Sequence, residues 1–397
     1  MPDTMRILFV HNRYQQAGGE DGVVQAEVSL LRAKGHEVEV MEEDNDGIVR
    51  WMDAAKTALQ CVYSIGSSRE IQERIRRFKP DLAHIHNFFP RLSPSIHYAC
   101  HKAKIPVVQT LHNYRLLCPE ARFFRDGGIC EECMGKAIPW PAVQHRCYRE
   151  SRAASAAVAN MLAVHRACRT WDRTVTRFIA LTEFARNKFI EGGLPGDKIV
   201  VKPNFVDPDP GMGEGNGGYA LFVGRLSEEK GIGMLLSSWS RLAGGQRLKI
   251  VGDGPLASTV RQATATVPGV EWLGARSMSE VLGLMGDAAF LILPSVWYEG
   301  FPLVLVEAFA AGLPIIASRL GAMEELVAEG YTGRLFTAGE AGELATLLKW
   351  AFSHTQDVRE MRGHARNMFI NRYTAESNYA VLTSIYRSAV SIERNTR

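Results

Sequence analysis

The fold of this chain is decided by SVWYEGFPLVLVEAFAAGLP, which runs from Ser295 to Pro314. An apolar run at 288–293 precedes it and predicts a buried strand. Pro302 suits the first position of a helix, because the N–H that proline lacks would have no partner there. Gly312 and Pro314 are helix stop signals. The stretch therefore predicts a strand, a turn and a helix, the repeating unit of a parallel α/β sheet.

Two carboxylates stand out in this stretch. Glu307 lies within an almost wholly apolar helix, where a carboxylate is costly to bury without a partner. Glu299 and Gly300 occupy the strand-to-helix turn, where free backbone N–H groups gather. Each acid has an ordinary interpretation, since Glu299 would complement the helix dipole and Glu307 would reach solvent. The two together favour a polar ligand site at the carboxyl end of a strand.

The composition of the 397-residue chain is that of a soluble α/β protein with two or three domains. The net charge of +3 is too small to indicate nucleic acid binding. The sequence shows no secretory signal and no run of about 18 apolar residues, so we expect a cytoplasmic protein. Basic residues cluster at 69–79 and 146–188, and they form either a solvated face or a peripheral contact with the anionic inner face of a membrane.

Two series of alternating strands and helices follow one another along the chain. The first has expected strands at 6–10, 37–40, 82–86, 107–111, 178–182 and 198–202. The second has expected strands at 220–223, 247–251, 270–273, 288–293 and 314–317. A linker rich in proline and then glycine lies between them at 203–218. We expect an α/β protein of two Rossmann-like domains, 1–203 and 204–374, whose parallel sheets face across a cleft. A last helix at 375–397 is expected to pack back on the first domain.

The second series carries cations as well as acids. Arg225 follows its first strand and Lys230 comes shortly after, and both side chains suit phosphate oxygens. The next strand ends in a loop that contains Gly254, where the backbone can approach a ligand closely. Glu299 and Glu307 are poor partners for phosphate but good acceptors for sugar hydroxyls. The combination predicts a nucleotide-sugar site.

The first series offers weaker signals. His112 comes directly after the strand at 107–111, at a sheet edge where ligands bind in α/β proteins. A lone histidine is more often structural. Gly18 and Gly19 precede a helix, and paired glycines let backbone N–H groups approach an anion there. A tight turn explains these two glycines equally well.

An insert at 115–150 breaks the alternation of strands and helices. It contains Cys118, Cys130, Cys133 and Cys147. One C-x2-C pair with two outlying cysteines fits a closed, tetrahedral zinc site that is structural rather than catalytic. The spacing is not that of a standard finger or ribbon, and four reduced, half-buried thiols are an equally good interpretation.

These motifs resemble those of the retaining GT-B glycosyltransferases of glycosyltransferase family 4, and the resemblance covers nearly the whole chain. The matching strings are Gly18-Gly19-Glu20, His112, Pro203-Asn204, Val223-Gly224-Arg225 with Lys230-Gly231, Val251-Gly252-Asp253-Gly254, and Glu299-Gly300-Phe301-Pro302 with Glu307. The cysteine insert is not part of the family pattern. It lies where acceptor-side loops would be, so we expect it to shape the choice of acceptor.

The resemblance implies a role for each matching residue. Arg225 and Lys230 would bind the donor diphosphate and neutralise the charge that develops as it leaves. Glu307 would hold the ribose hydroxyls. His112 and Glu299 would be the catalytic residues beside the transferred sugar. The other donor-binding residues implied by the resemblance are Gly19, Gly254, Gly300, Phe301, Pro302 and Leu303.

The expected function is transfer of a hexose-type sugar, with retention, from a nucleotide-diphosphate sugar to a glycan or lipid-linked acceptor in cell-surface polysaccharide or glycolipid synthesis. No catalytic metal is expected, because the cationic clamp already stabilises the leaving group. Two other classes of protein remain open. One is a sugar-nucleotide epimerase of the same fold, and the other is a non-catalytic carbohydrate-binding protein.

Overall fold

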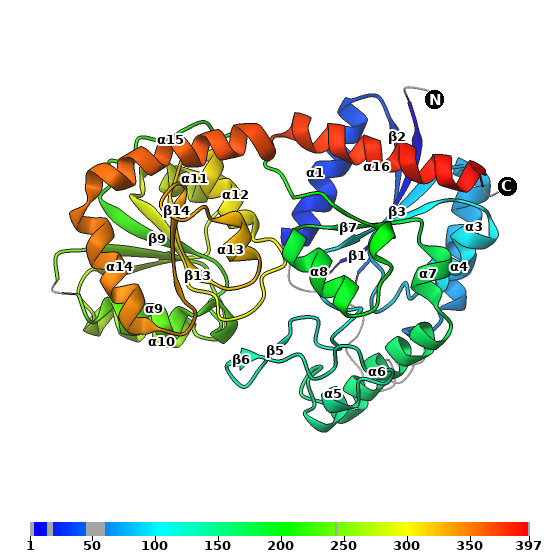
Figure 1. Ribbon diagram of the computed structural model, residues 1–397, viewed down its shortest axis with the longest axis horizontal. Helices are drawn as coiled ribbons and strands as arrows, with labels where there is room; N and C mark the ends of the chain where they lie inside the picture. The colour runs from blue at the N-terminus through cyan, green and yellow to red at the C-terminus, as the bar shows by residue number, and fades with distance from the viewer. Residues whose placement is uncertain (1–3, 14–18, 45–59, 243, 396–397) are drawn as a thin grey trace. The chain divides into compact units, whose positions relative to one another are not determined.

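The structure is a computed structural model that describes residues 4–13, 19–44, 60–242 and 244–395. The chain divides into two compact units. The N-terminal unit comprises residues 1–123, 131–203 and 378–397, and the C-terminal unit comprises residues 124–130 and 204–377. Each unit consists of a parallel sheet with helices packed on it (Figure 1). Gly18, which the sequence proposes as a ligand contact, lies outside the described residues.

The N-terminal unit is built on a six-stranded sheet in the order β2-β1-β3-β4-β7-β8. The strands are β1 (Arg6–Asn12), β2 (Glu37–Glu43), β3 (Leu82–Asn87), β4 (Val107–Leu111), β7 (Arg177–Ala180) and β8 (Ile199–Val201). The helices of this unit are α1 (Gly19–Ala33), α3 (Ile65–Phe78), α4 (Ser95–Lys102), α5 (Trp140–Gln144), α6 (Arg152–Ala167), α7 (Thr170–Thr174) and α8 (Glu183–Glu191). The direction of winding reverses between β1 and β3, so ligands are expected at the carboxyl ends of these strands.

The core of the N-terminal unit is completed by the last helix, α16 (Ala375–Asn395). Leu382 and Tyr386 of this helix pack in one buried cluster with Phe9 of β1 and Val108 of β4. Strand β3 is buried at all six positions, as expected for a central strand covered on both faces. Two of those positions are histidines, whose polar atoms must find partners inside the protein.

The C-terminal unit has a second six-stranded parallel sheet, in the order β11-β10-β9-β12-β13-β14. The strands are β9 (Tyr219–Val223), β10 (Arg247–Val251), β11 (Val270–Gly274), β12 (Phe290–Leu293), β13 (Ile315–Arg319) and β14 (Gly333–Thr337). The helices are α9 (Ile232–Trp239), α10 (Ala257–Thr266), α11 (Met278–Asp287), α12 (Leu303–Ala310), α13 (Ala322–Leu326), α14 (Ala341–Ser353) and α15 (Thr355–Arg372). Trp239, Phe222 and Phe290 fill the core on one face of this sheet. The winding reverses between β9 and β12.

The predicted fold class is confirmed, because both units carry the parallel sheets that the sequence indicated. Several elements were not predicted, among them strand β14 and the helices α3, α4, α13 and α15. A 3₁₀ turn, Glu228–Lys230, precedes α9. Pro302 precedes α12 as its N-cap rather than being its first helical residue. Within the described helices, none is both long and apolar enough to cross a membrane.

Candidate functional site

The loops after β9 and β12 meet at the switch point of the C-terminal sheet, and they bring Lys230 and Glu299 together. The Lys230 Nζ donates a hydrogen bond of 2.7 Å to Oε1 of Glu299. The Ser295 hydroxyl donates to the same oxygen, also at 2.7 Å. The side chain of Glu299 is 6% exposed and that of Lys230 is 25% exposed, so the ammonium remains accessible to a ligand. The sequence predicted both residues but not their pairing.

The backbone explains why these two loops hold their positions. Gly231 has a φ of +70°, and a Cβ at this residue would lie 1.9 Å from the carbonyl oxygen of Pro294. Only glycine allows that approach. The N–H of Val296 donates to the carbonyl of Glu229 at 2.9 Å, which ties the second loop to the first. The Lys230 ammonium also lies 5.3 Å from the ring centroid of Trp297.

Arg225 differs from its neighbour Lys230. Its side chain is exposed at the carboxyl end of β9, and no carboxylate of the described residues pairs with it. The loop that carries Gly254 packs against this segment, since a Cβ on Gly254 would lie 2.6 Å from the carbonyl oxygen of Leu226. The N–H of Leu226 donates to the carbonyl of Asp253 at 2.9 Å. An exposed, uncompensated guanidinium beside two tightly packed loops is suited to an anion.

Glu307 lies inside α12 and is 9% exposed. Burial raises the pKa of its carboxyl group to about 7. No cation of the described residues pairs with it. A buried acid without a compensating charge marks a candidate ligand site, because a ligand hydroxyl would supply the hydrogen bond that is missing.

The turn between the two acids is fixed by its aromatic residue. Phe301 is 8% exposed, and its ring centroid lies 6.0 Å from that of Tyr373. Gly300 and Leu303 are each partly exposed on either side of Phe301 and Pro302. Because α12 begins at Leu303, the first N–H groups of that helix are available to a ligand at this turn.

In the N-terminal unit, His112 directly follows β4 and is partly exposed. Its Nε2 lies 2.9 Å from Nδ1 of His86 on β3. Burial, and then the charges of His11 and Lys202, lower the pKa of His112 to about 3. The ring is therefore neutral at physiological pH. Gly19 is the exposed first residue of α1.

Sequence reasoning missed a buried ion pair behind His112. Lys202 Nζ lies 2.7 Å from Oε1 of Glu27, and both side chains are 1% exposed. The signal was present in the sequence, since Glu27 falls among the apolar residues of α1 and Lys202 follows the apolar strand β8. A charged residue on an apolar face requires a partner, but the identity of that partner is not readable from spacing.

The zinc site predicted at Cys118, Cys130, Cys133 and Cys147 is not assembled in the structure. Within the described ranges, the one set of side chains close enough to share a metal ion is Glu27, His84 and His86. Cys118 and Cys133 are buried, and burial raises the pKa of the Cys118 thiol, which opposes formation of the thiolate that zinc needs. The sequence spacing allowed four ligands, but the folded insert does not bring three of them together.

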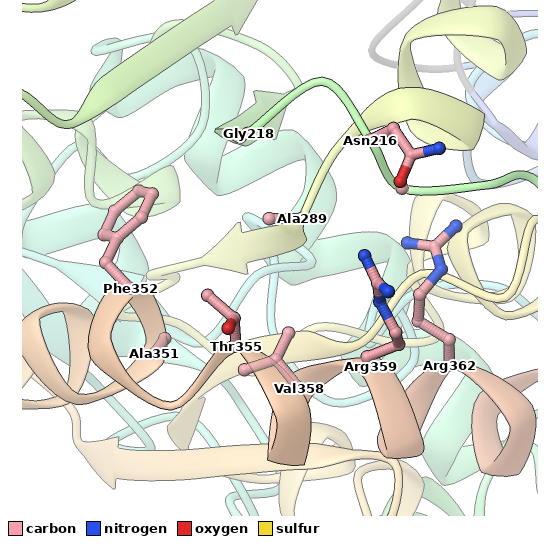
Figure 2. Close-up of a pocket in the computed structure, with 10 residues that line it drawn as sticks. Asn216, Gly218, Ala289, Ala351, Phe352, Thr355, Val358, Arg359 and Arg362 are labelled. Atoms are coloured by element: carbon pink, nitrogen blue, oxygen red, sulfur yellow. The ribbon is translucent and has the colours of Figure 1, made fainter.

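A cavity of about 310 Å³ lies at the opposite edge of the C-terminal sheet, near the residues that precede β9 and β12. Figure 2 shows Arg359 and Arg362 on its floor, with both guanidinium groups directed toward the segment that carries Asn216. Arg362 donates to the backbone carbonyls of Ala288 and Gly213, each at 2.9 Å. These bonds tie α15 to the sheet, so Arg362 has a structural role, and the cavity contains none of the residues that the sequence singled out.

Two family models match the chain. The model described as Glycosyltransferase Family 4 matches residues 17–210, and the model described as Glycosyl transferases group 1 matches residues 217–354. Arg225, Lys230, Glu299 and Glu307 fall in the second range, and His112 falls in the first.

Two curated proteins that are named as glycosyltransferases or mannosyltransferases are similar to part of the chain. The chain is 27% identical over 212 residues to an uncharacterized glycosyltransferase of Methanocaldococcus jannaschii. It is 31% identical over 195 residues to a phosphatidyl-myo-inositol mannosyltransferase of Mycobacterium leprae. These alignments cover 53% and 45% of this chain, and 59% and 50% of the relatives' own lengths. The chain thus spans little more than half the length of the curated relatives that it matches.

A solved structure resembles the chain over almost its whole length. It is HepE of Anabaena in complex with UDP-glucose, which matches with a TM-score of 0.63 and 19% identity. The match covers 96% of this chain and 99% of the HepE chain. At this identity the likeness establishes the fold.

Proposed function

Because this chain belongs to the GT-B glycosyltransferases of glycosyltransferase family 4, we propose that it transfers a hexose, with retention, from a nucleoside-diphosphate sugar to a glycan or lipid-linked acceptor. One observation carries the proposal. Arg225, which pairs with no carboxylate of the described residues, and the accessible Lys230 both follow β9, and the buried Glu299 follows the adjacent strand β12. Cations for a diphosphate and a carboxylate for sugar hydroxyls therefore lie at one edge of a sheet.

In this proposal Arg225 and Lys230 bind the diphosphate. Lys230 already donates to Glu299, so an incoming phosphate oxygen shares the remaining donors of the ammonium. Glu299 then has a free oxygen to accept a hydrogen bond from a hydroxyl of the sugar. Glu307 accepts hydrogen bonds from the ribose hydroxyls, and Gly254 lets the backbone approach the donor. The N–H groups near Gly300 and Leu303 complete the donor contacts.

The chemistry needs stabilisation of the leaving diphosphate. The bond between the anomeric carbon and the phosphate oxygen breaks, and the acceptor oxygen forms a bond on the same face. The acceptor proton passes to the departing phosphate oxygen. Negative charge grows on the diphosphate as the bond breaks, and two preorganised cations stabilise that charge more strongly than they stabilise the bound donor.

Two features guide the choice of substrates. HepE was solved with UDP-glucose, so UDP sugars are the first donors to test. The mycobacterial relative is named for a lipid acceptor, and the exposed Arg69 and Arg76 of α3 offer cations to an anionic membrane surface. We therefore propose a glycolipid or lipid-linked glycan acceptor, reached from the cytoplasmic side of the membrane.

The test is hydrolysis of a panel of UDP, GDP and ADP sugars by the full chain without acceptor. We expect slow release of one nucleoside diphosphate together with a free sugar of retained anomeric configuration, detected by NMR before mutarotation. Recovery of an epimerised sugar would instead establish an epimerase. Tight binding of a carbohydrate with no turnover of any donor would establish a binding protein.

A further inference from the structure

A row of buried polar side chains runs inward from His112 through the N-terminal sheet. His112 Nε2 lies 2.9 Å from His86 Nδ1. The other nitrogen of His86, Nε2, lies 3.5 Å from Oε2 of Glu27. The second oxygen of Glu27 accepts a hydrogen bond from Lys202 at 2.7 Å. The four side chains come from β4, β3, α1 and β8, so the row crosses the middle of the unit.

Two atoms of this row face each other without a hydrogen-bond partner of their own. They are Oε2 of Glu27 and Nε2 of His86, both fully buried. A buried acceptor beside a ring nitrogen is stabilised when that nitrogen carries a proton, and it is repelled by a ring lone pair. The carboxylate therefore selects the tautomer of His86 that is protonated at Nε2.

A metal ion at this place is the competing interpretation, because Glu27, His84 and His86 lie close enough to share one. Lys202 argues against it, since its ammonium already neutralises Glu27 at 2.7 Å. His84 is engaged as well. Its Nδ1 lies 2.7 Å from the Tyr386 hydroxyl and its Nε2 lies 2.8 Å from the Thr110 hydroxyl. The carboxylate is thus already compensated by a cation, and both nitrogens of His84 already have hydroxyl partners.

The tautomer of His86 determines the tautomer of His112. With its proton on Nε2, His86 offers a lone pair at Nδ1, so His112 must donate from its own Nε2. The remaining nitrogen of His112, Nδ1, is then an acceptor. No described residue forms a hydrogen bond with that nitrogen, and the side chain is partly exposed. Burial lowers the pKa of both rings, so both histidines are neutral. Each neutral ring carries its proton on one of its two nitrogens.

We propose that Glu27 and His86 are positioning residues that hold His112 with its proton on Nε2, so that Nδ1 accepts a hydrogen bond from a hydroxyl of the transferred sugar. The inference rests on the function proposed above for its substrate, but the tautomers themselves do not depend on it. The Lys202 ammonium pairs with the other oxygen of Glu27 at 2.7 Å. The arrangement uses the principle by which a carboxylate fixes a catalytic or metal-bound histidine through its second nitrogen.

The decisive variant is Glu27→Gln, which should move the protons of His86 and His112 to the other nitrogen of each ring. Lys202 will take the amide oxygen, so the amide NH₂ will face His86. His86 must then accept at Nε2 and donate from Nδ1, and His112 must accept at Nε2 and carry its proton on Nδ1. The exposed nitrogen of His112 becomes a donor. His86→Leu serves as a second variant, because it removes the link without changing the buried charges.

The measurement is ring ¹⁵N NMR of the full chain labelled at histidine, without any sugar, with His112 assigned from the spectrum of His112→Asn. We expect the Nε2-protonated form in the wild type, the Nδ1-protonated form in Glu27→Gln and a mixture in His86→Leu. Tyr386→Phe is the matched control, since it removes an equally buried hydroxyl from His84 and should leave His112 unchanged. An Nδ1-protonated His112 in the wild type, or no change in both variants, would overturn the proposal.

The second measurement is donor hydrolysis. We expect kcat to fall about 10- to 100-fold in Glu27→Gln, with KM for the donor changed less than about threefold, and full activity in Tyr386→Phe. An inverted tautomer with unchanged kcat would overturn the positioning role. If the wild type hydrolyses no donor, the proposed function fails while the tautomer result stands on the spectra alone.

Discussion

The two units present their charges in opposite ways. In the C-terminal unit Arg225 and Lys230 reach the surface at the switch point, and Glu299 is buried beneath them. In the N-terminal unit the ion pair of Glu27 and Lys202 is fully buried, and the partly exposed group is the neutral ring of His112. In the functions proposed above, one unit offers charge directly to a ligand, whereas the other uses a buried charge to orient a neutral hydrogen-bonding group. The same α/β topology therefore supports both binding of an anion and orientation of a hydrogen bond.

The largest effect is expected at the pair of Lys230 and Glu299. Lys230→Ala and Glu299→Ala should each lower kcat/KM for the donor by about a thousandfold or more, because each removes a group that stabilises the leaving diphosphate or the sugar. Far-UV circular dichroism should show an unchanged fold. Lys349→Ala is the matched control, since Lys349 is an exposed lysine on α14 of the same unit. Activity near that of the wild type in either site variant would remove the assignment.

The buried pair should affect stability instead. Lys202→Met leaves the Glu27 carboxylate buried without its partner, and we expect a loss of about 3–5 kcal/mol in the free energy of unfolding of the unit. The double variant Lys202→Met, Glu27→Leu should recover most of that loss, because two apolar groups replace two charges. Urea titration followed by circular dichroism measures both. A double variant that is no more stable than the single one would mean that the pair does not act as a unit.

The buried carboxyl group of Glu307 should make the stability of the protein depend on pH. Its folded pKa, about 7, lies above the ordinary value of 4.5, so folding favours the protonated form. The stability of the wild type should therefore fall as the pH rises from about 4.5 to 7. Glu307→Gln removes this dependence and should be more stable than the wild type at pH 8 by roughly 2–3 kcal/mol, with little difference at pH 4.5. Thermal unfolding across this range, with donor binding measured in parallel, should show a more stable but weaker-binding variant.

Ser295→Ala should give the smallest effect. It removes one of the two hydrogen bonds to Oε1 of Glu299 and leaves Lys230 in place. The expected change is about 1 kcal/mol, or a fall of roughly fivefold in kcat/KM. A loss as large as that in Lys230→Ala would show that the serine, rather than the lysine, holds the carboxylate in position.

Much of the architecture could be predicted, because buried parallel strands are short apolar runs bounded by glycine and proline. Strand β14, Gly333–Thr337, escaped prediction because Leu335 and Phe336 are its only two apolar side chains. Helix α15 escaped because charged residues occur all round it, including the buried Arg362 that donates to backbone carbonyls. In both cases tertiary contacts supply the stabilisation that a local pattern does not reveal.

In the candidate site, the sequence revealed the important residue types but not the partners of those residues. The acids at Glu299 and Glu307 were identified because a carboxylate in an apolar setting is conspicuous in any sequence. The partners of the charged residues could not be predicted, since Lys230 and Glu299 stand 69 positions apart in the sequence and Glu27 and Lys202 stand 175 apart. The four cysteines show a related limit, because a spacing alone does not determine where a folded loop places its side chains.

The last helix carries a consequence for synthesis of the protein. Asn378 hydrogen-bonds the carbonyl of Pro203, 175 positions earlier, and the Tyr386 hydroxyl lies 2.7 Å from Nδ1 of His84. Leu382, Ile385 and Ala389 belong to the same apolar core as Phe9. A ribosome therefore releases the strands of the first unit long before the residues that complete its core. We expect that unit to remain exposed to chaperones and proteases during translation, and to reach its final stability only after the whole second unit has been made.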